Sequence, residues 1–460
     1  MKEVESTEDK KSIVKKDWTK GSITGNLWSL AWPMTISSAI MMLGPTIDMI
    51  WIGKLGSASI AGVGTSGIIV MLINSLIMGL FTGLRAMVAR FVGAGDEKSA
   101  NHVSQQAFVI GIGLSLFLAA IGLFFAESIL SIWHLAPEVV AEGAAYMRIQ
   151  LVGIFTMSFG MVAQSIMQAS GDAKTPMKIS IGVRIFHILL CPFLIFGWSM
   201  FPRLGVSGAA LTSVISQGLG GAVALWILFS GRTRLHLTLR NYSIDGNMIW
   251  RVVKIGVPAS LGGIHMNIGS YVFMWFIAPY GTLAVAGHTL VARVDQFVLM
   301  PAMGLGAAAG ILAAQNLGAG QPERSERTAW IAVGWFTSIM LLFSMAMWFW
   351  AEPVVRIFNA EPDLVDIGSK FLKIQIASYM LNGLMIVLMN CLNSVGDTLV
   401  SMIIDIVTMW GIRVPLAIFI PRITTLGVYG IRWALVADTV SSAIVFVVYF
   451  LLGRWKHKKV

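Results

Sequence analysis

Charge is scarce in this sequence. Asp, Glu, Lys and Arg make up 12% of its 460 residues, whereas a soluble domain carries about 25%. Hydrophobic residues account for 56% of the chain and the mean hydropathy is +0.77. These values exclude an ordinary soluble protein and predict one that lies in lipid. Cysteine is scarce too: Cys191 and Cys391 both lie inside apolar runs, which predicts no disulfide framework.

The signatures of nucleotide chemistry and of catalysis are also missing. Gly-x-Gly turns occur at 93–95 and 318–320, but no strand pattern precedes them and no Walker lysine pattern follows them. No nucleophile and base stand in a recognisable arrangement. From these missing motifs we expect a protein that is not an enzyme and has no catalytic residues, no cofactor and no resident metal. Residues 1–26 also lack the short apolar core of a cleaved signal peptide, so we expect no cleaved peptide.

Long apolar runs, by contrast, recur along the chain. A helix needs about 20 apolar residues to cross the hydrocarbon core of a bilayer, and twelve runs of that kind are present. Two of the divisions between runs depend on breaks at Pro202-Arg203-Leu204-Gly205 and at Pro421-Arg422. The sequence thus predicts an all-α integral membrane protein. Its transmembrane helices are expected at 27–51, 60–84, 101–126, 144–168, 178–200, 205–230, 250–277, 284–313, 328–350, 368–393, 398–420 and 427–453.

The positive charges that are present mark one side of the membrane. Lys and Arg gather in the tail 1–26, in alternate connections between the runs, in the linker 231–249 and in the tail 454–460. Because cytoplasmic segments carry the excess of Lys and Arg, we expect both termini in the cytoplasm and the chain in the plasma (inner) membrane. The net charge of +10 is then a topology signal, and no nucleic-acid partner is predicted.

The second half of the chain repeats the first at a shift of 225 residues, which slips to 222 toward the end of the repeat. The repeat predicts two pseudo-symmetric six-helix bundles at 27–230 and 250–453, joined by a cytoplasmic linker at 231–249. Since each half holds an even number of spans, the symmetry axis runs along the membrane normal, as in transporters with parallel repeats; a static duplicated scaffold is the alternative. Matching positions include Pro33 and Pro258, Gly56 and Gly281, Gly79 and Gly304, Gly93-Ala94-Gly95 and Gly318-Ala319-Gly320, Gln150 and Gln375, and Gly171-Asp172 and Gly396-Asp397.

Several motifs taken together resemble one protein family. They are Asp48 with Trp51-Ile52-Gly53-Lys54-Leu55-Gly56, Val92-Gly93-Ala94-Gly95-Asp96, Gln168-Ala169-Ser170-Gly171-Asp172-Ala173-Lys174-Thr175-Pro176 and Ala314-Gln315-Asn316-Leu317-Gly318-Ala319-Gly320. On these residues the chain resembles, over essentially its whole length, the multidrug and toxic compound extrusion (MATE) transporters of prokaryotic type. The resemblance implies a V-shaped pair of six-helix bundles. It also implies efflux of small amphipathic, often cationic, compounds driven by inward flow of protons or sodium.

Asp48 stands near the outer end of the first apolar run, among Ile, Met and Trp. A charged side chain in the membrane costs about 2.5–3.5 kcal/mol on insertion scales and marks a functional site by default. Desolvation favours the neutral acid, so such a group can load a proton on one side and release it on the other. Pro33 and Pro45 remove backbone donors and permit a bend in this helix. The alternative for Asp48 is a structural hydrogen bond near the outer interface.

The fifth apolar run departs from the family pattern. Many prokaryotic members carry an Asn and, one turn later, an Asp in this helix, where the chain has His187 and Cys191. His187 is a candidate to titrate in place of the missing acid, because an imidazole changes charge near neutral pH. Arg184 is a candidate partner that would keep Asp48 ionised, and Gln164 falls on the family's polar position in the fourth run. A structural cross-link between helices is the alternative for His187 and Arg184, and Cys191 is predicted to be a packing residue.

Acids in the second half stand at unfamiliar positions. Sodium-coupled members of one branch of the family carry a Glu in the seventh run and an Asp in the tenth, and the sequence has neither, which weakens a sodium site of that kind. The acids that are present, Asp295, Asp405 and Asp438, offer the oxygen ligands that hard cations prefer. The alternative is pairing with Arg413 and Arg432 for Asp405 and Asp438, and with an arginine on another helix for Asp295. We favour pairing for Asp438 and keep Asp295 and Asp405 as candidates for cation coupling.

The lining of a substrate cavity is the last feature that the sequence suggests. Met266 and Tyr271, with Gln164 and Arg184, are candidates, because flexible and aromatic side chains adapt to varied ligands; lipid contact is the alternative. Together with the export of amphipathic compounds that the resemblance implies, the repeat predicts a monomeric antiporter that works by alternating access between the two bundles. Protons are favoured over sodium as the coupling ion, with Asp48 as its carrier. A lipid-linked oligosaccharide flippase and a non-transporting membrane scaffold are the alternatives.

Overall fold

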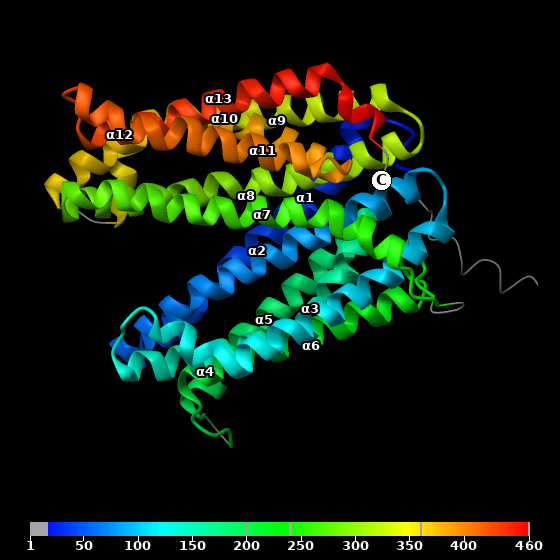
Figure 1. Cartoon of the computed structure of the whole chain (residues 1–460), viewed down its shortest axis with the longest axis horizontal. Coiled ribbons are helices and arrows are strands. Elements are labelled where there is room, and N and C mark those ends of the chain that lie inside the picture. The colour runs from blue at the N-terminus through cyan, green and yellow to red at the C-terminus, as the bar shows by residue number, and fades with distance from the viewer. Residues whose placement is uncertain (1–16, 199, 239–241, 359–360, 459–460) are drawn as a thin grey trace, which may run out of the picture.

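Two groups of helices make up the molecule. The computed structural model describes residues 17–198, 200–238, 242–358 and 361–458. Within these residues all regular elements are helical, and twelve helical segments are long and apolar enough to cross a membrane. The two groups come together at the end where the C-terminus lies and diverge toward the other end (Figure 1). The predicted fold class, an all-α membrane protein of twelve spans in a V-shaped arrangement, is confirmed.

The first half of the chain supplies six long helices. Several of their ends are fixed by polar caps: the Ser22 side chain caps the first helix, and Asp96 caps the third by accepting the backbone N–H of Ser99 at 3.0 Å. Hydrogen bonds from Ser99 also hold the pKa of Asp96 below its usual range. The helices are α1 Ile23–Ile52, α2 Ser57–Gly93, α3 Glu97–Ser131, α4 Pro137–Ala169, α5 Lys174–Phe196 and α6 Gly205–Phe229.

The second half supplies the other six spans, and its eleventh span is not a regular α-helix. A π-helical segment, η2, joins α11 to α12 there, and π-bulges are frequent at functional sites. The last part continues through Pro421 to Ile423, past the predicted break, because a membrane helix tolerates the one missing backbone donor of a proline. The elements are α7 Gly246–Ile277, η1 Ala278–Tyr280, α8 Thr282–Gly318, α9 Pro322–Phe358, α10 Pro362–Ser394, α11 Thr398–Thr408, η2 Met409–Arg413, α12 Val414–Ile423, α13 Val428–Leu452 and η3 Arg454–His457.

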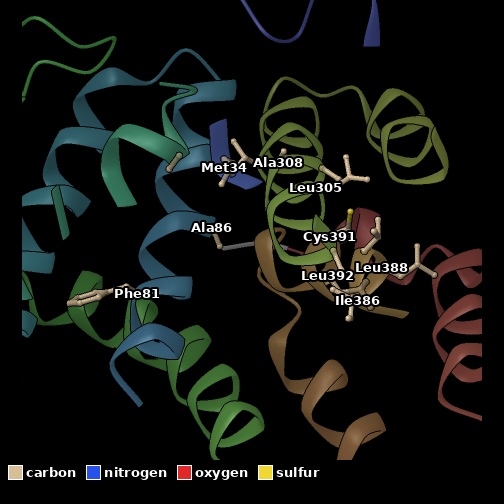
Figure 2. Packing of buried hydrophobic residues seen from close by; sticks show 14 of the residues in the cluster. Met34, Phe81, Ala86, Leu305, Ala308, Ile386, Leu388, Cys391 and Leu392 are labelled. Atoms are coloured by element: carbon tan, nitrogen blue, oxygen red, sulfur yellow. The ribbon is translucent and has the colours of Figure 1, made fainter. Parts of the chain in front are cut away.

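Four helices carry the contact between the two halves. Helices α1 and α2 pack against α7 and α8, and Figure 2 shows the buried Met34 of α1 facing α8. Glycines let the backbones approach: a Cβ atom on Gly79 would lie 2.2 Å from the backbone nitrogen of Ser260, and one on Gly304 would lie 2.4 Å from Cα of Thr35. Small residues at such contacts are typical of helix packing in membranes. Gly79 and Gly304 are matching positions of the repeat, so the repeat places equivalent contacts on both sides.

The converging end is closed by contacts between the halves. Nε2 of Gln315 on α8 donates to the carbonyl of Ala169 at 2.6 Å, at the end of α4. Nη2 of Arg90 on α2 donates to the carbonyl of Lys458 at 3.0 Å, close to the C-terminus. Gly93 lies against the backbone of Gln315, where a Cβ atom would be 2.0 Å from the carbonyl oxygen. This end is therefore held by side-chain hydrogen bonds and by direct backbone contact.

The segment that links the two halves is tied to α3. Nε2 of Gln106 donates to the carbonyl of Ser243 at 2.7 Å, and the backbone N–H of Asp245 donates to Oε1 of Gln106 at 3.1 Å. Asp245 also caps α7, accepting the N–H of Met248 at 3.1 Å, and its other oxygen lies 3.2 Å from Nε2 of His102. The hydrogen bonds from Met248 and then His102 lower the pKa of Asp245. The predicted tails 1–26 and 454–460 lie partly outside the described residues.

Candidate functional site

Asp48 forms a buried pair with His187. Asp48 lies on α1, one turn before the helix ends at Ile52, and its Oδ1 is 2.6 Å from Nε2 of His187 on α5. The side chains are 11% and 3% exposed, respectively. Two bare acceptors would repel at this separation, so a proton lies between the oxygen and the nitrogen. The structure thus brings together two of the predicted coupling residues from helices that are far apart in the sequence.

Cys191 completes a three-residue cluster. It follows His187 by four residues on α5, so the two side chains lie on the same face of the helix. Cys191 is fully buried, and its Sγ lies 3.8 Å from Oδ1 of Asp48, as a thiol donor would. Within the described residues, the oxygen, nitrogen and sulfur of this cluster all lie within 4.8 Å of one another. The cluster can exchange protons among its members, and it offers three ligand atoms of different kinds.

Two further polar groups face this cluster. Arg184, also on α5, packs its guanidinium against α1 at Gly44, where a Cβ atom would meet Nη1 at 2.3 Å, and it lies within electrostatic range of Asp48. Tyr146 on α4 is within electrostatic range as well, and its hydroxyl accepts a hydrogen bond from Gln150 at 3.1 Å. In the part of the chain that the structure describes, the direct partner of Asp48 is His187 and not the predicted Arg184. The guanidinium of Arg184 instead packs against the backbone of α1 at Gly44, beside the Asp48–His187 pair.

The other residues predicted for this half lie apart from the cluster. Gln164 is half-buried on α4, and among the described residues no hydrogen bond connects it to Asp48, His187 or Cys191. Pro33 lies within α1, which runs unbroken from Ile23 to Ile52 in this conformation. The side chain of Pro45 lies outside the described residues. The predicted bend at these prolines therefore stays a prediction about a different conformation.

Asp295 belongs to a second polar cluster, in the C-terminal half. It lies half-buried on α8, where its Oδ1 accepts a hydrogen bond from the Tyr379 hydroxyl of α10 at 2.8 Å. Arg432 on α13 is within electrostatic range of this carboxylate. Arg432 is 1% exposed and stacks its guanidinium 4.9 Å above the ring of Phe371. Asp295 is thus a membrane carboxylate with a neutral donor and a nearby positive charge.

Asp405 and Asp438 share a third cluster around the π-helical segment. Arg413, the last residue of η2, donates to Oδ2 of Asp438 from Nε at 2.9 Å and from Nη2 at 2.5 Å. This geometry agrees with the pairing that the sequence favoured for Asp438. Asp405 is half-buried on α11 and lies within electrostatic range of both groups. His265 of α7 lies on the same side, within electrostatic range of Arg413. Arg413 thus contacts Asp438 from the end of the π-helical segment.

The candidate cavity residues on α7 are accessible. Met266 is 50% exposed and Tyr271 is 47% exposed. Both residues stay candidates for the lining of the substrate cavity.

Sequence reasoning passed over several residues that the structure places at these sites. Tyr146 faces the Asp48 cluster and Tyr379 binds Asp295. The repeat held one usable signal: Gln150 and Gln375 occupy matching positions, and both are buried and hydrogen-bonded, Gln150 to Tyr146 and Gln375 to Ser378. Matching polar residues inside two apolar spans indicate buried networks in both halves, and the tyrosines could have been sought one turn away.

Comparison with known proteins decides the family. The family model described as MatE matches residues 33–193 and 258–419, one segment in each half of the repeat. The chain belongs to the MatE family. The resemblance read from the motifs is therefore confirmed, and the relatives in this family are transporters rather than enzymes.

Individual MatE relatives cover nearly the whole chain. It is 27% identical over 449 residues to the probable multidrug resistance protein YpnP of Bacillus subtilis, covering 96% of this chain and 98% of the relative. It is 24% identical over 445 residues to the probable multidrug resistance protein NorM of Thermotoga maritima, covering 95% and 94%. The crystal structure of MATE in the bent conformation is 25% identical, with a TM-score of 0.88 and coverage of 95% and 96%. The whole architecture of this chain is thus that of the MatE fold.

Proposed function

We propose that this MatE protein exports amphipathic, often cationic, compounds in exchange for protons, and that Asp48 carries the proton. The observation that carries the proposal is the buried contact between Asp48 on α1 and His187 on α5. Relatives named as multidrug resistance proteins support the substrate class. The unit of function is a single chain, because one chain supplies both halves and the complete cluster.

The contact couples protonation to the position of a helix. While Asp48 is ionised it accepts a short hydrogen bond from His187, and charge-assisted hydrogen bonds are roughly twice as strong as neutral ones. When Asp48 takes up a proton, that advantage is lost and α1 is less firmly held to α5. Arg184 and Tyr146 also lie within electrostatic range of this carboxylate, and their electrostatic interaction with it weakens when Asp48 becomes neutral. Proton uptake thus weakens the contact between α1 and α5 and makes it easier for α1 to move.

Alternating access follows from the arrangement of the halves. The charge distribution predicts that the termini are cytoplasmic, which makes the converging end the inner one and the diverging end the outer one (Figure 1). The inner end is closed by the contacts of Gln315 with Ala169 and of Arg90 with Lys458. Transport requires these contacts to break while equivalent ones form at the outer end. In this conformation the protein would release substrate and receive protons from outside, in the plasma membrane.

Protons suit the Asp48 cluster better than sodium does. Sodium is a hard cation that prefers several oxygen ligands. Two of the three ligand atoms in the cluster are the nitrogen of His187 and the sulfur of Cys191. The carboxylates Asp295 and Asp405 in the C-terminal half offer oxygen and are the second candidates for cation coupling. The family match speaks against the two alternatives, an oligosaccharide flippase and a static scaffold.

Antiport in proteoliposomes tests the proposal. Purified protein is reconstituted, a fluorescent cationic dye is loaded, and dye flux and internal pH are followed under an imposed pH gradient, with and without sodium. Wild-type protein should move protons when dye is present, independently of sodium. Asp48→Asn should reduce both fluxes to the level of protein-free liposomes, because a carboxamide cannot take up the proton.

Asp366→Asn is the matched control for this experiment. Asp366 pairs with Lys370 at 2.7 Å on α10, and both side chains are more than half exposed, so its removal should leave transport unchanged. Unchanged antiport in Asp48→Asn would remove Asp48 from the mechanism. Dye flux driven by a sodium gradient at constant pH would contradict proton coupling and would assign sodium coupling to the carboxylates of the C-terminal half.

A further inference from the structure

The Asp48 cluster has the composition of a transition-metal site. Its three ligand atoms are a carboxylate oxygen, an imidazole nitrogen and a thiol sulfur, and all three residues are buried. We propose that Asp48, His187 and Cys191 bind a borderline-soft divalent cation of the Zn²⁺ type. The sequence predicted no metal, because the acid is separated from His187 by 139 residues of chain and only the fold brings them together.

The distances between the ligand atoms fit a tetrahedral ion. Bonds of about 2.0–2.3 Å from Zn²⁺ to oxygen, nitrogen and sulfur place neighbouring ligand atoms about 3.3–3.8 Å apart. The Cys191 sulfur already lies 3.8 Å from Oδ1 of Asp48. The Asp48 oxygen and the His187 nitrogen, at 2.6 Å, must separate by less than about 1 Å once the proton between them is replaced by the metal. Rotation of two side chains supplies that change without moving either helix far.

Binding the metal requires loss of protons. The Cys191 thiol proton passes to water as the sulfur–metal bond forms, and the proton between Asp48 and His187 leaves Nε2 for water as the nitrogen–metal bond forms. If Nδ1 was bare, it takes up a proton from water, so that the ring stays neutral. His187 binds through Nε2 as the neutral ring with its proton on Nδ1, and Asp48 binds as the carboxylate. The thiolate and the carboxylate then balance the two positive charges of the ion. With three protein ligands, the fourth position is open to water, as in exchangeable rather than closed zinc sites.

The surroundings of the cluster select for a soft dication. Arg184 places a positive charge within electrostatic range of Asp48, which weakens the binding of any cation. Sodium would gain a single good ligand here, the oxygen of Asp48, and does not overcome that repulsion. Zn²⁺ and Cd²⁺ gain bonds to nitrogen and sulfur that do not depend on the carboxylate alone. Tyr146, the other facing group, is neutral and does not oppose the metal.

Metal binding should also inhibit transport. The metal occupies Oδ1 of Asp48, the atom on which proton coupling depends, and it cross-links α1 to α5. This second part rests on the proposed function, whereas the binding itself does not. The two are therefore measured separately, first by a binding assay that involves no transport.

Cobalt spectroscopy on the purified, full-length protein in detergent tests the binding. Co²⁺ is the probe, because a thiolate ligand gives it an intense near-ultraviolet charge-transfer band; Zn²⁺ should then abolish the band by competition. Wild-type protein should show the band at one Co²⁺ per chain. Cys191→Ser and Cys191→Ala should both lose it, and His187→Gln and Asp48→Asn should weaken Zn²⁺ binding at least about 10-fold, as loss of ligand support does in zinc sites.

Cys391→Ser is the matched control, since Cys391 is the other buried free cysteine, on α10 in the other half. It should keep the band and the Zn²⁺ affinity of wild type. Melting curves without metal check that each variant is folded, and Zn²⁺ should raise the melting temperature of wild type but not of Cys191→Ala. Absence of the band in wild type, or its persistence in folded Cys191→Ala, would overturn the site. Zn²⁺ binding that leaves dye-coupled proton flux intact would overturn the inhibition alone.

Discussion

Replacing Gly93 by Ala should loosen the converging end of the transporter, which is the inner, closed end in the proposed orientation. Gly93 ends α2 and meets the backbone of Gln315 on α8, where a Cβ atom would lie 2.0 Å from the carbonyl oxygen and 2.6 Å from Cα. Backbone atoms cannot rotate away as a side chain can, so the two halves must separate at this point. Gly318, at the matching position of the repeat, makes the reciprocal contact: a Cβ atom there would lie 2.1 Å from the carbonyl oxygen of Arg90. The same substitution at Gly318 should act in the same direction.

The size of the effect follows from the cost of overpacking. An extra methyl group in a well-packed contact costs about 1–3 kcal/mol, and that cost falls only on the conformation in which this end is closed. The gain in helix propensity from glycine to alanine, about 1 kcal/mol, is the same in both conformations and cancels. The ratio of closed to open inner ends should therefore fall by about 5- to 150-fold.

Distances between spin labels at the inner end measure this ratio. Lys98 and Glu323 are exposed residues near the starts of α3 and α9, one in each half, and the two native cysteines are buried. Double electron–electron resonance should show a short distance for wild type and a growing population of longer distances for Gly93→Ala. Gly334→Ala is the control, because nothing lies within 4 Å of a Cβ atom there. An unchanged distribution for Gly93→Ala, or an equal change for Gly334→Ala, would refute the reasoning.

Two further predictions concern the C-terminal half and the linker. Arg413→Ala should destabilise the protein by about 3–5 kcal/mol, because it leaves the 5% exposed carboxylate of Asp438 without its partner; thermal unfolding in detergent measures this, and Asp438→Asn introduced in addition should restore part of the loss. The pKa of Asp245 is lowered by the Met248 N–H and by His102, so its hold on the linker should be present above the ordinary carboxyl pKa and lost as the pH falls through the lowered value. Limited proteolysis of the linker across that acidic range should show increasing cleavage for wild type and a pH-independent, higher rate for Asp245→Asn.

The number and order of the spans could be predicted from the sequence because hydropathy is a local property. The edges could not, because helices continue through polar turns beyond the hydrocarbon. Helix α9, for example, runs from Pro322 to Phe358, whereas its apolar run was 328–350. The connection after the eleventh span was placed at Pro421, where the helix continues to Ile423. A proline weakens a helix locally, but packing in the folded protein decides whether the helix stops.

The candidate site shows a similar division between local and non-local information. Asp48 stands out in the sequence because a charged group in an apolar run is costly, and His187 stands out because it departs from the family pattern in the fifth run. Their pairing was not foreseen, because nothing in a single sequence states which helices touch, and Arg184 was the expected partner of the acid. The sequence predicts a packing role for Cys191, because a cysteine in an apolar run does not reveal which residues surround it in the fold. Its meaning comes from the acid that the fold places 3.8 Å away.

In the proposed function, helix α1 would connect proton binding at Asp48 to the movement of the two halves. Near its outer end Asp48 contacts α5 of its own half, whereas near its middle Thr35 lies against Gly304 on α8 of the other half. At a rise of about 1.5 Å per residue, the two contacts are about 20 Å apart along one helix. A change in how firmly Asp48 is held would therefore reach, along one continuous helix, the surface on which the two halves are proposed to rock. No other helix is needed to connect the proposed coupling site with the contact between the halves, because α1 contributes to both.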